Sequence, residues 1–298
     1  MPFGLRNAGA SFCRAVQYVL RPINDFCASY VDDIGVGSYE WCQHLNHLRQ
    51  FFDVIRSAGF TINLKKCEFA QPSVKFVGHI IGSGKQEPDR GRIEDLLKVE
   101  EPKNKKDVRK FLGAIGYYRM YVPNFAHIAK PLTDLTHKGR SNEFCLTVEQ
   151  RKAFKQLKAA LCEAPRLNVP IFGKPFVLHS DASGFAVGAT LGQTDEQGCE
   201  RPLAFASQKL TQTQSAWSTI EREAYAIVWA LNRFRDIVYG SKITVKCDHN
   251  PLQFLRECAP KSAKLRRWSL ALQELDVEIE FKKGRNNVVA DFLSRSVQ

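Results

Sequence analysis

Residues 219–231 read TIEREAYAIVWAL, and this stretch is the clearest guide to the fold of the chain. Its apolar residues recur at spacings of three and four, which is the period of one face of an α-helix. They are Ile220, Ala224, Ile227 and Leu231. Glu223 lies on the same stripe, and a carboxylate facing inward must be paired, hydrogen-bonded or bound to a metal ion because burying it alone is costly. The pattern predicts a helix over about 218–238 that packs on a core and carries one such acid.

Strand-like stretches lie on both sides of this predicted helix. Three precede it, at 176–181, 186–193 and 202–208, and two follow it, at 242–247 and 277–281. A helix is expected at 263–274 between the last two, and a final helix near Asn287. Strands and helices in this order predict an α/β (α+β) domain, in which helices pack on a mixed five-stranded sheet.

The first half of the chain has a different pattern, with shorter strands and more helix. Helices are expected at 12–20, 44–58, 92–99, 105–122 and 148–161. A strand–turn–strand unit is expected at 28–36, with Asp32 and Asp33 at its bend, and a single strand at 74–81. With 298 residues the chain is long enough for more than one domain.

The charge balance favours a nucleic-acid partner. The chain has 43 Lys and Arg against 31 Asp and Glu, a net charge of +12 that is spread along both halves. A basic surface releases counterions when it meets a phosphate backbone. The alternative is a positive surface that only keeps the protein soluble.

Other compositional features exclude some classes of protein. None of the nine cysteines forms a CxxC pair, so neither a zinc knuckle nor a redox motif is indicated. No apolar run approaches the length needed to span a bilayer, and no signal peptide is apparent, so no membrane partner is expected. An intracellular chain with reduced cysteines is the simpler interpretation, and nothing in the sequence distinguishes nucleus from cytoplasm.

Four carboxylates stand at places where a sheet-and-helix fold could bring them together. Asp181 ends the first strand of the second half, Glu223 faces inward, Asp248 follows the strand at 242–247, and Asp291 opens the final helix. Such a set could hold two Mg²⁺ ions, which prefer oxygen ligands and can clamp the attacking and leaving oxygens of a phosphodiester. The alternative is that each acid is only a helix cap or a surface salt-bridge partner.

Four motifs carry a specific resemblance for this half. They are Ser180–Ser183 (SDAS), Thr219–Val228 (TIEREAYAIV), Cys247–Leu252 (CDHNPL) and Asn287–Arg295 (NVVADFLSR). In this order they resemble the ribonuclease H domain of gypsy-type LTR retrotransposon Pol polyproteins. The resemblance implies hydrolysis of the RNA strand of RNA–DNA hybrids, with Asp181, Glu223, Asp248 and Asp291 as catalytic metal ligands.

The resemblance also implies separate roles for these acids. Asp181 would bridge both ions, Glu223 and Asp248 would hold the ion beside the leaving oxygen, and Asp291 would complete the ion that activates water. The loop at 282–286 carries no histidine, unlike many cellular ribonucleases H, and His249 is expected to cap a helix.

The first half resembles the reverse transcriptase of the same family. The motifs are Met1–Ala8, Tyr30–Asp33 (YVDD), Gly59, Leu64–Phe69, Phe76–His79, Phe111–Arg119, Pro123–Phe125 and Pro131–Leu132. The resemblance implies a partial palm at 1–90, a thumb and connector at 91–170, and the ribonuclease H-like domain at 171–298.

In this family the fingers and a third metal-binding aspartate lie upstream of the motif at Met1–Ala8. Two-metal polymerisation needs that third carboxylate. We therefore expect that the chain alone does not polymerise DNA, and that Asp32 and Asp33 are ligands of an incomplete site.

A group of basic residues lies on and before the helix expected at 105–122, beside Tyr117 and Tyr118. They are Lys103, Lys105, Lys106, Arg109, Lys110 and Arg119. A basic helix flanked by aromatic rings can follow the backbone of an RNA–DNA hybrid by shape. The alternative is a solvated helix face without a partner.

The leading interpretation is therefore an RNase H-type endonuclease with a polymerase module that helps to bind RNA, DNA and their hybrid. One alternative is a piece of a full Pol polyprotein, with integrase and protease as further parts and RNA-directed DNA polymerase activity in the whole. The other is a nucleic-acid-binding remnant without catalysis.

Overall fold

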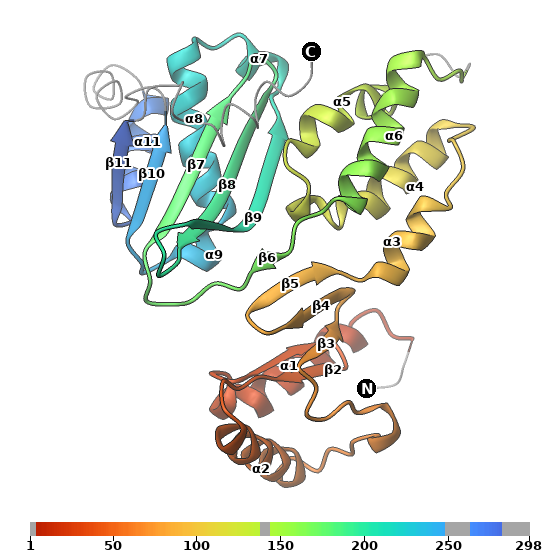
Figure 1. Ribbon diagram of the computed structural model, residues 1–298, viewed down its shortest axis with the longest axis vertical. Coiled ribbons are helices and arrows are strands. Elements are labelled where there is room, and N and C mark those ends of the chain that lie inside the picture. The colour runs from red at the N-terminus through yellow and green to blue at the C-terminus, as the bar shows by residue number, and fades with distance from the viewer. Residues whose placement is uncertain (1–3, 138–143, 248–262, 282–298) are drawn as a thin grey trace. The chain divides into compact units, whose positions relative to one another are not determined.

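The computed structural model describes residues 4–137, 144–247 and 263–281, and the chain divides into two compact units, Met1–Ser83 and Gly84–Gln298 (Figure 1). The first unit has its own apolar core, built from α1 (Ala8–Leu20), α2 (Trp41–Ser57) and the antiparallel hairpin of β1 (Cys27–Tyr30) and β2 (Asp33–Val36). Short 3₁₀ turns follow at Arg21–Ile23 and Leu64–Lys66. The two helices and the hairpin predicted in this region are confirmed.

The single strand predicted at 74–81 is wrong. The chain instead forms an antiparallel hairpin of β3 (Ser73–Phe76) and β4 (His79–Gly82), with Phe76 paired to His79. Val77 and Gly78 between them have φ values of 48° and 75°. Two central residues with positive φ make the tight turn whose twist matches a hairpin. The sequence did not indicate this turn, because the residues on both sides favour strands and valine rarely adopts a positive φ.

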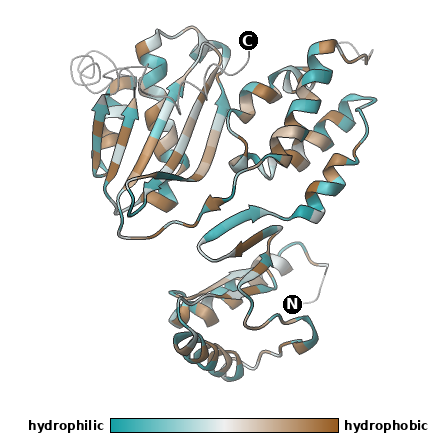
Figure 2. Ribbon diagram, viewed as in Figure 1, coloured by the Kyte–Doolittle hydropathy of each residue, from teal (hydrophilic) through white to brown (hydrophobic). Residues whose placement is uncertain are grey.

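The second unit begins with a helical region. Strand β5 (Lys85–Pro88) pairs with β6 (Leu167–Asn168), and the helices between them are α3 (Arg90–Leu97), α4 (Lys105–Gly116), α5 (Phe125–Leu135) and α6 (Val148–Cys162). Their inward faces form one buried cluster around Phe111, Leu132 and Leu157. Figure 2 shows hydrophobic and hydrophilic residues alternating along these helices, as amphipathic helices require.

The helix predicted at 105–122 stops at Gly116 and continues only as a 3₁₀ turn over Arg119–Tyr121. Helix α5 was not predicted. Pro131 lies inside it, where its ring removes a backbone hydrogen bond, so local propensity argued against a helix that packing imposes.

The rest of the second unit contains the predicted five-stranded mixed sheet, and its strands lie in the order β11-β10-β7-β8-β9. Strands β7 (Phe176–Ala182), β8 (Ala186–Thr194) and β9 (Glu200–Lys209) are antiparallel neighbours. Strand β10 (Ile243–Cys247) runs parallel to both β7 and β11 (Val277–Phe281). The last predicted helix, near Asn287, lies outside the described residues.

The helices described in this part of the chain are α7 (Gln212–Ser215), α8 (Thr219–Arg233), α9 (Arg235–Val238) and α11 (Ala263–Gln273). The long helix predicted at 218–238 is thus α8 and α9, separated at Phe234. Phe176 and Leu178 of β7 and Leu191 of β8 pack in one core cluster with Ile227 of α8. This cluster fixes α8 on one face of the sheet and leaves the other face for polar residues of β7.

Two further expectations concern the described part of the chain. The eight cysteines within it are present as reduced cysteines, outside disulfide bonds. Among its helices, none is both long and apolar enough to cross a membrane.

Candidate active site

Asp181 lies at the end of β7, where the chain leaves the buried part of the sheet. The five residues Phe176–Ser180 are buried, whereas Asp181 and Ala182 are half-buried. Asp181 pairs with Gly188 of β8. Because side chains alternate along a strand, Asp181 shares a face with His179 and not with Leu178, which packs on α8.

Glu223 lies in the first turns of α8 and is only 4% exposed, so the inward position predicted for it is confirmed. Helix α8 packs on β7, and the Nη1 of Arg222 donates to the carbonyl oxygen of Ser183 at 3.4 Å. Ser183 stands two residues after Asp181. The start of α8 and the end of β7 therefore meet, which brings Glu223 and Asp181 to the same end of the sheet.

The neighbouring acid, Glu221, has a structural role. It forms a capping box with Ser218 at the start of α8, and the Nζ of Lys264 on α11 donates to its Oε1 at 2.7 Å. The hydrogen bond from Lys264 is the main reason that the pKa of Glu221 lies below its ordinary value. Since Glu221 is engaged in this way, Glu223 is the better candidate for catalysis.

Asp248, Asp291, His249 and the loop at 282–286 lie outside the described residues. Strand β10, which precedes Asp248, is the parallel neighbour of β7, with Lys246 paired to His179. Among the residues described, no group of three or more metal-ligand side chains occurs. The two acids that are described are Asp181, which is half-buried, and Glu223, which is buried. Their carboxylate oxygens are the kind of ligand that Mg²⁺ prefers.

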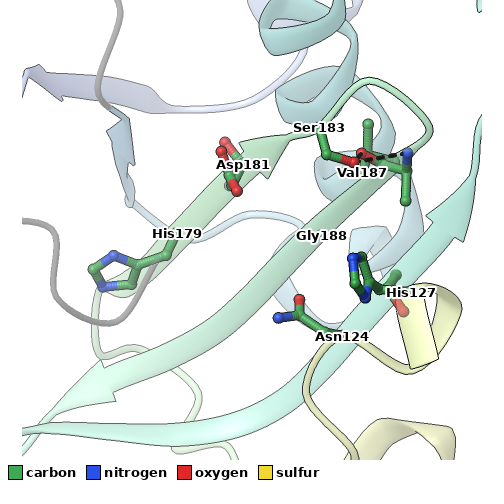
Figure 3. A pocket seen from close by; sticks show the side chains of 10 residues that line it. Asn124, His127, His179, Asp181, Ser183, Val187 and Gly188 are labelled. Carbon is green, nitrogen blue, oxygen red and sulfur yellow. Dashed lines mark hydrogen bonds between the residues drawn. The ribbon is translucent and has the colours of Figure 1, made fainter. Parts of the chain in front are cut away.

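A pocket to which several polar residues contribute opens beside Asp181 (Figure 3), and we call it the Asp181 pocket. It is lined by the β7 segment His179–Asp181, by Ser183, by Ala186–Gly188 of β8 and by Ser207 of β9. Asn124 and His127, at the start of α5, complete it. The helical region of the second unit therefore contributes to the same pocket as the predicted catalytic strand.

An ionic network of His179, Glu200 and Lys246, which the sequence did not indicate, lies on this face of the sheet. The buried His179 contacts Glu200 at 2.5 Å between Nε2 and Oε2, and the Nζ of Lys246 donates to Glu200 Oε1 at 2.5 Å. Burial alone would raise the pKa of Glu200, but the hydrogen bonds from Lys246 and His179 hold this pKa below its ordinary value. Residues so far apart in sequence give no local signal of such a network.

In the first unit, Asp32 and Asp33 stand at the tip of the hairpin β1–β2 and are both exposed. Val31 beside them has a φ of 55°, a strained conformation for a β-branched residue. Strain of this kind is typical of functional turns, so it supports a role for the aspartate pair without identifying it.

The basic residues predicted to bind nucleic acid do not share one environment. Lys103, Lys106, Arg109 and Lys110 are exposed and Lys105 is half-buried, all on or just before α4. Arg119 instead lies against the sheet, where its Nη2 donates to the carbonyl oxygen of Ser207 at 2.6 Å. Burial also lowers the pKa of Arg119, with a smaller contribution from Arg233.

The two tyrosines beside this helix also differ. Tyr118 is 2% exposed and packs in the helical core, so it cannot stack on a duplex, whereas Tyr117 is 44% exposed. Only the exposed ring could take part in the predicted interface.

Comparison with known proteins gives the family. Residues 171–275 match the "RNase H-like domain found in reverse transcriptase", and residues 1–81 match "Reverse transcriptase (RNA-dependent DNA polymerase)". The chain is 39% identical over 296 residues to the Retrovirus-related Pol polyprotein from transposon 297 of Drosophila melanogaster. Its homologues are retrotransposon Pol polyproteins.

The similarity extends over nearly the whole chain but over only part of each relative. It covers 99% of this chain and 27% of the transposon 297 polyprotein. The polyprotein of transposon opus, from the same organism, is 37% identical, with 99% and 30% covered. The chain thus spans less than a third of the length of these retrotransposon relatives.

A solved structure agrees with the fold. The foamy viral protease-reverse transcriptase dRH in complex with double-stranded DNA superposes with a TM-score of 0.81 at 25% identity. The match covers 95% of this chain and 50% of the viral one. The reverse transcriptase and RNase H-like fold class expected from the sequence is confirmed.

Proposed function

We propose that this chain hydrolyses the RNA strand of RNA–DNA hybrids at a site built from Asp181, Glu223, Asp248 and Asp291. The observation that carries the proposal is the hydrogen bond between Arg222, the neighbour of the buried Glu223 at the start of α8, and Ser183, which stands two residues after Asp181. A buried carboxylate beside a second carboxylate is stable when a cation neutralises them.

The four carboxylates would hold two Mg²⁺ ions, which when bound supply the positive charge that clamps the attacking and leaving oxygens of a phosphodiester. Asp181 presents its oxygens at the pocket, from a strand fixed on both sides by its neighbours. Glu223 approaches from beneath the same end of the sheet, on a helix anchored by the bond from Arg222 to Ser183. The chain therefore holds both acids on rigid elements.

The test is magnesium-dependent cleavage of a labelled RNA–DNA hybrid by the wild type, Asp181→Asn, Glu223→Gln and Glu221→Gln. We expect the first two variants to lose activity by roughly a hundredfold or more, because a two-metal site loses a ligand. Glu221→Gln is the matched control, two residues from Glu223 and bonded to Lys264. Equal activity of the wild type and Asp181→Asn would overturn the proposal.

We further propose that the chain has three functional parts: a partial palm at 1–90, a thumb and connector at 91–170, and the nuclease domain at 171–298. The names of its relatives suggest that these parts act within a Pol polyprotein. We propose a protease and an integrase as further parts of such a polyprotein. Such a protein works on RNA and DNA inside the cell.

For the first unit we propose that Asp32 and Asp33 are metal ligands of a polymerase site. Their support is exposure at a strained hairpin tip within the match to reverse transcriptase. Two-metal polymerisation requires a further carboxylate to bridge the ions. We therefore expect these 298 residues alone to show no primer extension on an RNA template with Mg²⁺ and dNTPs. Processive extension by this polypeptide would contradict that expectation.

A further inference from the structure

We propose that Asn124 and His127, from the connector, bind the sugar–phosphate backbone of the hybrid at the Asp181 pocket. This inference rests on the proposed nuclease function and extends it, because it makes the nuclease site depend on residues outside the RNase H-like match at 171–275. Four observations support it. Helix α5 is hydrogen-bonded to the sheet, and Ser207 caps this helix in place of Asn124. The side chain of Asn124 lies close to Gly188, and the ring of His127 packs on Phe185.

The start of α5 is hydrogen-bonded to strand β9 of the sheet. Arg119 donates to the carbonyl oxygen of Ser207 at 2.6 Å, and the backbone N–H of Ala126 donates to the Oγ of Ser207 at 2.8 Å. Further along α5, Asp134 forms an ion pair with Lys209 of β9. Because these contacts lie on both sides of Asn124 and His127, the two side chains are held at the pocket on a rigid frame.

The side chain of Asn124 does not cap the helix that it precedes. It stands at the N-cap of α5, where an asparagine side chain ordinarily accepts a hydrogen bond from the first turn, but its side chain makes no such bond. Ser207 caps α5 instead, because its Oγ accepts a hydrogen bond from the backbone N–H of Ala126 in the first turn. The amide of Asn124 can therefore serve another partner.

The side chain of Asn124 lies beside β8, the strand that neighbours Asp181 on β7 (Figure 3). Its Oδ1 would lie 3.5 Å from a Cβ placed on Gly188, the residue that pairs with Asp181 across the strands. Paired residues of antiparallel strands have Cα atoms about 5 Å apart. The amide thus reaches the immediate surroundings of Asp181, and the missing side chain at Gly188 leaves the space open.

His127 is held in place by packing and is kept neutral. Its ring lies 4.9 Å from the ring of Phe185, between centroids, in the turn that joins β7 to β8. Burial lowers its pKa, and the charge of Lys130 lowers it further. A neutral imidazole offers one donor and one acceptor.

An amide and a neutral imidazole suit the groups that a nucleic-acid strand would present here. Both can donate to a phosphate oxygen, and both can also accept from a sugar hydroxyl. Together with Ser183 they line the pocket with side chains that can both donate and accept hydrogen bonds. The expected contacts fix the register of the strand and do not read its sequence.

The experiment compares Asn124→Gly, His127→Phe and a control, His137→Phe, in the full 298-residue chain. Glycine accepts the φ of 53° at position 124, and phenylalanine keeps the ring packed on Phe185. His137 lies just beyond the end of α5 and is outside the pocket. Thermal unfolding should be alike in all four proteins, which separates a binding defect from a folding defect.

The readouts are KM and kcat for cleavage of a labelled RNA–DNA hybrid with Mg²⁺, and Kd for the same hybrid with Ca²⁺. Loss of one hydrogen bond predicts a rise of roughly threefold to tenfold in KM and Kd for Asn124→Gly and His127→Phe. We expect no rise for His137→Phe. A hybrid with single 2′-deoxy substitutions near the cut distinguishes the two contacts, because the defect disappears there if the sugar hydroxyl is bound and persists if the phosphate is bound.

The outcomes separate this inference from the proposed nuclease. If the wild type cleaves and both variants keep its KM and Kd, the inference is wrong and the nuclease assignment stands. If the wild type binds without cleaving and the variants bind more weakly, the nuclease assignment fails and the connector contact stands. If the wild type neither binds nor cleaves the hybrid, both are overturned.

Discussion

At the scale of single residues, burial and pairing separate side chains that look equivalent in the sequence. Glu221 and Glu223 are two positions apart, yet Glu221 caps a helix and pairs with Lys264 while Glu223 is buried. Tyr117 and Tyr118 are adjacent, yet one is exposed and the other lies in the core. Side-chain environment, not residue type, decides which of each pair is available for function.

The network of His179, Glu200 and Lys246 gives a pH-dependent prediction at this scale. Hydrogen bonds to a charged group contribute about 1–3 kcal/mol, so Glu200→Gln should lower the free energy of unfolding by roughly that amount at pH 7. The pKa of Glu200 is depressed in the folded state, below the ordinary value of 4.5. Its contribution is therefore fully present above pH 4.5 and is lost as the pH falls through the folded value.

Urea denaturation of the wild type and Glu200→Gln between pH 7 and pH 3 measures this contribution. The control is Glu278→Gln, which removes an exposed pair with Lys242 and should change stability by less than about 1 kcal/mol. A stability gap between wild type and Glu200→Gln that stays constant down to pH 3 would contradict the assignment.

At the scale of elements, amphipathic helices present one face to a core and the other to solvent or a partner. Helix α4 buries Val108, Phe111 and Ile115, and its opposite side carries exposed Lys106, Arg109 and Lys110. We propose that this basic side follows the phosphate backbone of the hybrid. Arg119, by contrast, belongs to the anchor between connector and sheet.

The double variant Lys106→Gln with Lys110→Gln tests the role of α4. Each phosphate contact contributes about 0.9 to the slope of log Kd against log salt, so losing two should reduce the slope by up to about 1.8. The control is Lys152→Gln with Lys155→Gln, which removes the same charge from exposed positions on α6. Equal slopes for the two double variants would show that only net charge matters and would eliminate α4 as a specific contact.

At the scale of the whole molecule, the chain consists of two compact units with separate apolar cores. The core around α1, α2 and the first hairpin contains only residues of the first unit, and the clusters around the helices and the five-stranded sheet contain only residues of the second. The two groups of predicted metal ligands can therefore be assigned to different units. The predicted nuclease acids belong to the second unit, and the aspartate pair at the hairpin tip belongs to the first.

Much of this organisation could be predicted from the sequence because it rests on local periodicity. The five-stranded sheet, the amphipathic α8 and the inward position of Glu223 follow from repeats of two and of about 3.6 residues, which side chains impose wherever a sheet or helix covers a core. Motif order also identified the Pol family, which the comparisons confirm. The catalytic roles of the four acids stay predictions.

Other features depend on contacts between residues far apart in the sequence, and only the tertiary structure shows them. The reversal at Val77 and Gly78, the helix around Pro131 and the burial of Tyr118 each run against local preference or leave no local signal. The cap that Ser207 provides for α5 joins residues 81 positions apart. Such pairs form because packing brings the two segments together, and the free energy of that packing depends on the whole fold and not on either segment alone.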